Sequence, residues 1–182
     1  MKKQKTKDIF AGTLLELAEK VPMNRITVTM LVKESGLSSK TFYNHFANIY
    51  ELMSYVEMSE ASRLQEKVMD PGYTYREYLK DGLHLYSSIQ SFIKNASQNT
   101  SGAESFEKLH AETAYMTTRS FLLKRNHMSA VSEELDFALR LYAFGLVEVY
   151  AIYFSGQYQM NDEEFLDHCI SNMPSVLQGY LL

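Results

Sequence analysis

The chain has 182 residues, 46% of them apolar, which is enough to build a sizeable core in one domain or two small ones. Its single cysteine, Cys169, excludes an internal disulfide framework and a paired-cysteine site, and we expect a buried, inert thiol. The start is basic and then amphipathic, without the long apolar run of a secretory signal, so we expect a cytoplasmic protein.

The net charge of −4 conceals an asymmetry between the two ends of the chain. Residues 1–50 hold eight basic and four acidic residues and so carry +4, whereas the remaining residues hold ten basic and eighteen acidic residues and carry −8. A basic N-terminal part on an acidic body is typical of a nucleic-acid footprint at that end. The alternative is a basic tail that only aids solubility.

The first predicted helix covers Lys5–Glu19, where apolar residues recur at helical spacing. Pro22 ends it, and residues 21–25 are predicted to form a loop. Several lysines lie at or before the start of this helix and could contact phosphates, which require charge and reach rather than a fixed geometry. They are Lys2, Lys3, Lys5 and Lys7.

The next stretch predicts two short helices joined by a tight turn. Thr27 is a candidate N-cap for a helix over residues 28–35, and Gly36 follows where a positive φ commonly ends a helix. Ser38 is then a candidate N-cap for a second helix over residues 39–46. In that helix Phe42 and Phe46 share one side, which we expect to pack into a core beneath the first predicted helix.

The opposite side of the second short helix presents Lys40 and Asn44, flanked by Thr41, Tyr43 and His45. Lysine can donate to guanine and asparagine can bond adenine in the major groove, where a helix–turn–helix places its second helix. A solvated helix of an ordinary small bundle is the alternative for any one such helix. The caps, the glycine and the aromatic spacing together favour DNA binding.

The block from Ile26 to Leu52 resembles the DNA-binding region of the TetR/AcrR family of bacterial regulators. The shared features are Thr27–Val28, Gly36–Leu37–Ser38, Thr41–Phe42–Tyr43, His45–Phe46 and Leu52. The resemblance implies a transcription regulator that binds a palindromic operator in double-stranded DNA as a homodimer. With the helical projection, it nominates nine residues for DNA contact: Thr27, Ser38, Ser39, Lys40, Thr41, Tyr43, Asn44, His45 and Asn48.

One position departs from that family. A lysine commonly follows a small polar residue at the start of the fourth helix, whereas here Asn48 is followed by Ile49, so one phosphate contact is in doubt. The C-terminal half, with Tyr142–Ala143–Phe144–Gly145 in an apolar helix, is more weakly similar to the branch that includes dihydroxyacetone-kinase activators.

The rest of the chain is predicted to form further helices. Asp70–Pro71–Gly72 predicts a turn, and residues 94–104 predict a polar loop whose two glycosylation-type sequons, at Asn95 and Asn99, we attribute to chance. Asn161 with Glu164 predicts a capping box, and Pro174 should kink or interrupt the last helix. The predicted helices cover residues 48–68, 75–95, 105–125, 132–154 and 161–180.

The helix over residues 132–154 has a membrane-spanning length, but Asp136, Arg140 and Glu148 within it argue against a membrane. A helix that is apolar nearly all round must be buried on several sides. We expect it to pack on its own core and, with the last helix, on a second subunit, with Ala138 and Gly145 allowing close approach.

A search for chemistry finds no phosphate loop, nucleophile motif or zinc motif, so we expect no enzyme, cofactor or metal site. His84 and His110 could meet in the core as ligand contacts or a metal pair, although structural histidines explain them more simply. A small-molecule effector of unknown identity is implied by the resemblance alone.

The sequence thus predicts an all-α protein. Residues 1–50 form a three-helix DNA-binding domain with a helix–turn–helix, and residues 51–182 form a helical dimerisation and effector-sensing bundle. The rival interpretation is an effector-binding or protein-interaction module that has lost operator binding, which Ile49 and the overall acidity favour.

Overall fold

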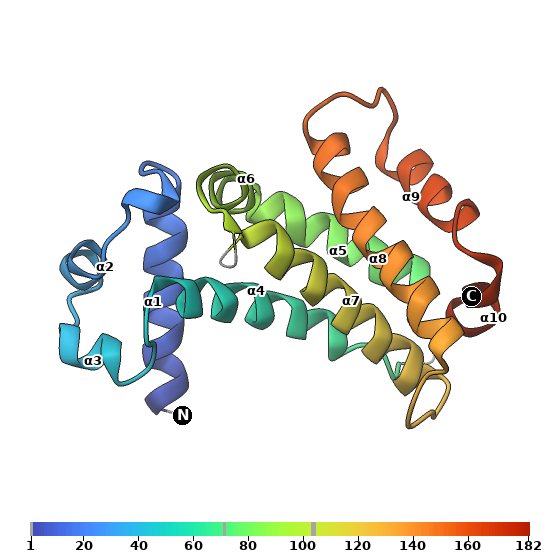
Figure 1. The fold of residues 1–182 in the computed structure, drawn as a ribbon, viewed down its shortest axis with the longest axis horizontal. Coiled ribbons are helices and arrows are strands. Elements are labelled where there is room, and N and C mark those ends of the chain that lie inside the picture. Colours follow the sequence, from blue (N-terminus) through green and yellow to red (C-terminus); the bar gives the residue numbers. More distant parts are fainter. Residues whose placement is uncertain (1, 71, 103–104) are drawn as a thin grey trace. The chain divides into compact units, whose positions relative to one another are not determined.

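The computed structural model describes residues 2–70, 72–102 and 105–182, and the side chains of Lys2 and Lys3, two of the predicted phosphate contacts, lie outside that description. Over the described residues the chain forms ten α-helices, one 3-10 helix and no strand, which confirms the all-α prediction. In chain order (Figure 1) the elements are α1 (Lys2–Ala18), η1 (Met23–Arg25), α2 (Val28–Ser35), α3 (Ser39–Tyr43), α4 (Ile49–Gln65), α5 (Tyr75–Ser88), α6 (Gln90–Asn99), α7 (Phe106–Arg125), α8 (Glu133–Phe154), α9 (Asp162–Ser171) and α10 (Ser175–Leu181).

The helices divide into two compact units. Unit 1 comprises Met1–Ser59 and Ile89–Leu109, and unit 2 comprises Glu60–Ser88 and His110–Leu182. Unit 1 is therefore discontinuous in sequence, because α6 packs against α1 and η1. The assignment of DNA binding to residues 1–50 and of effector sensing to residues 51–182 is a division by function, and it stays a prediction.

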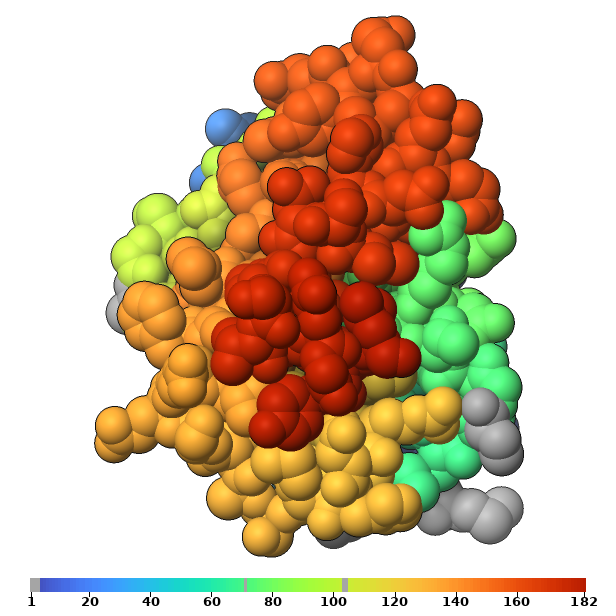
Figure 2. All heavy atoms as spheres, turned by 90° about the vertical axis from the view of Figure 1, so that its right-hand side faces the viewer, coloured from blue at the N-terminus to red at the C-terminus, as the bar shows by residue number. Residues whose placement is uncertain are grey.

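Within unit 2, α8 supplies the central packing surface. The Ser132 hydroxyl caps it by accepting a hydrogen bond from the Leu135 backbone N–H, and Leu139 and Ala143 on its inner face are completely buried. In the space-filling view, α10, in dark red, occupies the middle of one face of this unit, flanked by orange atoms of the segment that contains α8 (Figure 2). Burial of that inner face is the main driving force for placing α8.

A capping box starts α9, as predicted. The Asn161 side chain accepts from the Glu164 N–H, and the Glu164 carboxylate accepts from the Asn161 N–H. Ion pairs then join α9 to α5: Glu163 bonds both Arg76 and Lys80, and these two cations lower the pKa of Glu163 to about 2. Glu163 is exposed and the two cations are half-exposed, so solvent screens this network and it adds little stability. Of the kink or interruption predicted at Pro174, the structure shows the interruption, a break between α9 and α10.

By length and composition, α8 is the single helix of the described chain that could cross a membrane. It carries acidic residues in its first turn together with Asp136, Arg140 and Glu148. Its inner face belongs to the core of unit 2, and 28% of its most apolar stretch is buried in the structure.

The helix bounds predicted around α5 and α6 are wrong. The helix predicted over residues 75–95 is broken at Ile89, whose φ of −119° and ψ of 21° are not helical. Residues 94–99, predicted as part of a polar loop, belong to α6. The apolar residues before the break are buried in unit 2 and those after it in unit 1.

Candidate nucleic-acid interface

A capped helix, a glycine turn and a second capped helix form the centre of this site. The Thr27 hydroxyl accepts from the Met30 N–H at 3.3 Å and starts α2. Gly36 ends α2 with φ +68°, a conformation that residues with a side chain rarely adopt, although no atom would crowd a Cβ there. The Ser38 hydroxyl then accepts from the Thr41 N–H at 3.1 Å and starts α3. Local chemistry therefore specifies a helix–turn–helix.

Three phenylalanines anchor the inner side of α3. Phe10 of α1 meets Phe42 edge-on at a ring-centroid distance of 5.3 Å and Phe46 at 6.3 Å. All three side chains are at most 2% exposed. Edge-to-face pairs add to the free energy gained by burying these rings. The expected packing of α1 on Phe42 and Phe46 is confirmed, and it fixes which side of α3 faces solvent.

The outer side of α3 presents polar groups, as the projection predicted. Ser39, Lys40, Tyr43 and Asn44 are exposed, and Tyr43 keeps 60% of its surface in solvent. Over the described part of the chain, the Lys40 ammonium and the Asn44 amide make no hydrogen bond or ion pair. Their donors are thus available to a partner. Both groups can bond base edges.

The helix itself is shorter than predicted. α3 ends at Tyr43, and Asn44 and His45 form a turn instead of continuing the helix to Phe46. The Phe46 N–H still donates to the Phe42 carbonyl at 2.9 Å, so helical spacing is kept for one more turn. This is why projecting the residues around a helix placed Asn44 and Phe46 on the correct sides.

The other nominated residues are either partly buried or use their side chains to cap a helix. Thr41 and His45 are half-buried, and the Thr41 hydroxyl lies 2.8 Å from that of Ser38. The Asn48 side chain is exposed and caps α4 by accepting from the Glu51 N–H at 2.9 Å. A capping hydroxyl can still donate its proton, and a capping amide still has its NH₂ group. These side chains can therefore cap a helix and still donate a hydrogen bond to a phosphate.

One charged group near this surface was not predicted. The Glu51 carboxylate accepts from the Ala47 N–H at 2.6 Å, at the start of α4. The Asn48–x–x–Glu51 spacing is that of a capping box and could have signalled it. The negative charge occupies the helix end to which a phosphate would bind, and Ile49 beside it adds no cation.

The lysines of α1 are not equivalent. Lys7 lies over the rings of Phe46 and Tyr55, at 5.4 and 5.0 Å from their centroids, whereas Lys5 is exposed. The Tyr55 hydroxyl donates to Asp8, and desolvation together with this carboxylate raises the pKa of Tyr55 to about 12. Lys7 thus helps to pack α1 on α4, which leaves Lys5 better placed to reach a phosphate.

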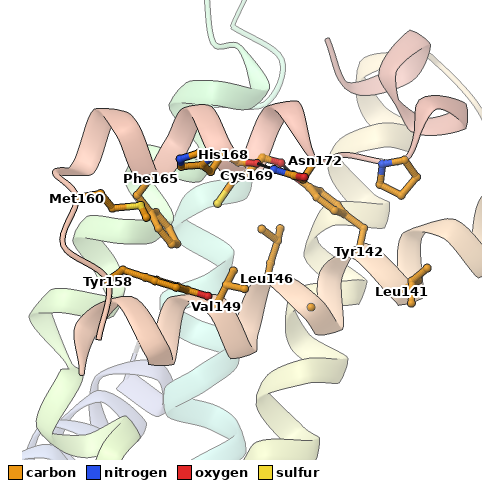
Figure 3. A pocket seen from close by; sticks show the side chains of 12 residues that line it. Leu141, Tyr142, Leu146, Val149, Tyr158, Met160, Phe165, His168, Cys169 and Asn172 are labelled. Atoms are coloured by element: carbon orange, nitrogen blue, oxygen red, sulfur yellow. Dashed lines mark hydrogen bonds between the residues drawn. The ribbon is translucent and has the colours of Figure 1, made fainter. Parts of the chain in front are cut away.

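Unit 2 has a separate surface feature on α8. Phe137 and Leu141 are 72% and 64% exposed, and Phe144 is 39% exposed, at the i, i+4 and i+7 spacing of one helix face. We call these three side chains the α8 apolar stripe. Beside it, α8 and α9 border a groove of about 510 Å³ (Figure 3). Its walls include Leu146, Val149 and Phe165, with His168 and Asn172 as polar groups.

Tyrosine hydroxyls are buried in the core of unit 2. Tyr142 donates to the Cys169 carbonyl and Tyr150 to the Leu79 carbonyl, both at 2.8 Å. Tyr75 is only 1% exposed, and its hydroxyl has no hydrogen-bond partner in the structure as described. Burial raises the pKa of Tyr75 well above its usual value. The nearby Thr118 hydroxyl opposes that rise, but it does not form a hydrogen bond of normal geometry with Tyr75.

Replacing Tyr75 with phenylalanine is expected to stabilise the protein by about 1–3 kcal/mol, because it removes an unpaired buried hydroxyl and keeps the ring. Tyr142→Phe is the matched control, since it removes a hydroxyl that does donate, and it should destabilise by about 1 kcal/mol. Chemical denaturation followed by circular dichroism measures both. A destabilised Tyr75→Phe variant would mean that this hydroxyl is hydrogen-bonded in solution.

The histidines and the cysteine lie apart in the described chain. His84 is exposed on α5 rather than inside the core, which argues against the alternative that His84 and His110 meet there as ligand contacts or a metal pair. His110 lies against the ring of Tyr86 instead. No cluster of three or more His, Cys, Asp and Glu side chains suited to a metal ion occurs in residues 2–70, 72–102 and 105–182. Cys169 is buried, which raises its pKa to about 12, as expected of an inert thiol.

Comparison with known proteins bears on the fold. No protein-family model matches the sequence, and no curated protein matches it either. Among solved structures, the chain is similar to "Dihydroxyacetone kinase operon activator DhaS", with a TM-score of 0.65 and 17% sequence identity over 97% of this chain and 98% of that one. The likeness spans both units. The protein therefore has the all-helical fold of that operon activator over nearly its whole length.

Proposed function

We propose that this protein is a TetR-like transcription regulator that reads double-stranded DNA with α3. The observation that carries the proposal is the two-sided character of α3, anchored by Phe42 and Phe46 and presenting free polar groups on Lys40, Tyr43 and Asn44. Such a helix after a glycine turn is suited to enter the major groove. The shared fold with an operon activator adds support.

The proposal extends to assembly on a palindromic operator. The α8 apolar stripe is exposed in the protomer, and apolar patches of this kind mark interaction surfaces. A homodimer formed through α8 and α9 would cover the stripe and the adjacent groove. It would also present two copies of α3 to two half-sites related by a two-fold axis. The expected location is the cytoplasm.

Control by a ligand or partner at unit 2 is also proposed. The support is the buried Tyr75 hydroxyl, because a buried polar group without a partner calls for an explanation and a bound ligand would supply one. A small neutral molecule with a hydrogen-bond acceptor would satisfy it. Thermal-shift screening of wild type and Tyr75→Phe in parallel tests this, because a ligand of that site should raise the melting temperature of the wild type more.

Lys40→Ala is expected to weaken binding to the preferred operator by about 1–3 kcal/mol and to relax its sequence specificity, because Lys40 is the exposed cation of α3. Gel shifts against DNA flanking the protein's own coding region, with a scrambled competitor, measure both quantities. Lys124→Ala, an equal change in charge at an exposed position of α7 in unit 2, is the control. An unchanged ratio of cognate to scrambled affinity in Lys40→Ala would exclude base reading by Lys40.

The second candidate function is a protein-interaction or effector-binding module without operator binding. Glu51 favours it, because its carboxylate lies at the start of α4 where a phosphate would bind. Wild-type protein that binds no flanking DNA, together with Glu51→Gln protein that does, would support this alternative. Binding by the wild type decides for the regulator.

A further inference from the structure

One asparagine of α6 holds together the segment that leads into the helix–turn–helix. The Asn95 Nδ2 donates to the carbonyls of Ala18 at 2.6 Å and Val21 at 2.7 Å, and its Oδ1 accepts from the Met23 N–H at 2.8 Å. Asn99, one turn later on α6, donates its Nδ2 to both Oδ1 and the backbone carbonyl of Asn95 at 2.9 Å. All of these groups belong to unit 1.

The backbone groups that Asn95 bonds lie at a helix end or between helices, so no partner within a regular helix is available to them. Ala18 is the last residue of α1, so its carbonyl is one of those that a helix leaves without an intrahelical partner. Pro22, between Val21 and Met23, has no N–H to offer them. A carboxamide supplies two donors and an acceptor in one plane, which matches two carbonyls and one N–H. Asn99 fixes the orientation of that plane.

The connection that Asn95 holds sets the position of α2. η1 begins at Met23, which is 3% exposed, and Ile26 after it is 5% exposed, so the segment is held by packing as well as by Asn95. α2 begins at Val28, and α3 follows its glycine turn. Residues 19–25 therefore hold the entry to the helix–turn–helix, in addition to the packing of Phe42 and Phe46 on Phe10.

We infer that Asn95 is a positioning residue for DNA reading: it ties the α1–α2 connection to α6 and so fixes the orientation of the helix–turn–helix within unit 1. The inference rests on the proposed function for its consequence at DNA, but the positioning itself is a property of unit 1. Loss of the side-chain amide should leave α3 folded and its outer face intact, while the helix–turn–helix samples a wider range of orientations relative to α6.

A distance measurement without DNA tests the positioning. Spin labels at Lys33→Cys on α2 and Gln98→Cys on α6, both exposed sites of unit 1, report the spread of their separation. Cys169→Ala removes the native thiol. Adding Asn95→Ala should broaden the distance distribution clearly, at a temperature where circular dichroism shows full helicity. Ser97→Ala, on the same helix, is the control and should leave the distribution narrow. An unchanged width in Asn95→Ala would overturn the inference.

A second measurement tests the consequence at DNA. Operators with one base pair inserted or removed between the half-sites should be rejected by wild-type protein, because half-site spacing must match the dimer. Asn95→Ala should lose about tenfold in affinity for the natural spacing and discriminate less between the spacings. Merely lowered stability would reduce binding equally at every spacing. Unchanged discrimination with a broadened distance distribution would overturn the role at DNA, whereas a wild type that binds no operator would reject the proposed function and leave the distance result standing.

Discussion

Replacing Phe10 with alanine is expected to lower the free energy of unfolding of unit 1 by about 3–5 kcal/mol, the usual cost of deleting a fully buried phenylalanine. The ring lies edge-on to both Phe42 and Phe46, so its loss opens a cavity directly behind α3. Domains of this size are only marginally stable, and much of unit 1 would then open at moderate temperature. DNA binding should fall with it.

The measurement is amide hydrogen exchange of residues 28–46, because the chain contains no tryptophan to report on this unit by fluorescence. Ile9→Ala is the control: this neighbour on α1 is 38% exposed, and its removal should cost less than about 1 kcal/mol. Equal exchange in the two variants would mean that Phe10 does not anchor α3.

Gly145→Glu is expected to raise the dimer dissociation constant by more than about 100-fold, because an unpaired charge buried in an interface costs about 3 kcal/mol or more. In the protomer Gly145 is exposed and a Cβ would meet no atom within 4 Å. The fold of the protomer should therefore survive. Replacing this glycine inside α8 should stabilise the helix by nearly 1 kcal/mol through the higher helix propensity of the new residue.

Sedimentation over a concentration series, with a melting curve for each variant, separates the two effects. Gly145→Ala changes helix propensity without charge and is the matched control. A Gly145→Glu dimer as tight as that of wild type would place the interface elsewhere, and a wild type that is monomeric at micromolar concentration would reject the homodimer.

The helix–turn–helix was predictable because its determinants are local. Thr27, Gly36 and Ser38 act on backbone groups within four residues of themselves, so their pattern in the sequence specifies the structure directly. The spacing of Phe42 and Phe46 similarly revealed which side of α3 is buried.

What the sequence did not reveal depends on distant contacts. Leu83, Tyr86, Ile89, Phe92 and Ile93 keep a helical rhythm through the break at Ile89, and no proline or glycine marks it. The break coincides with the boundary between the two units, which only the three-dimensional contacts reveal. Asn95 lies in a polar stretch that resembles a loop, and its three partners in the α1–α2 connection lie more than 70 positions away.

The discontinuity of unit 1 has a consequence for how the chain folds as it is made. The Met23 N–H cannot bond the Asn95 side chain until that residue has been synthesised. The last segment of unit 1 ends at Leu109. Synthesis of the fifty residues from Glu60 to Leu109 takes about 3–10 s at ordinary rates of translation. Throughout that interval Phe10, Phe42 and Phe46 can pack, but the end of α1 keeps its carbonyls in water. A nascent chain paused before Asn95 should therefore remain sensitive to protease at residues 19–25, and that sensitivity should disappear once Leu109 has left the ribosome.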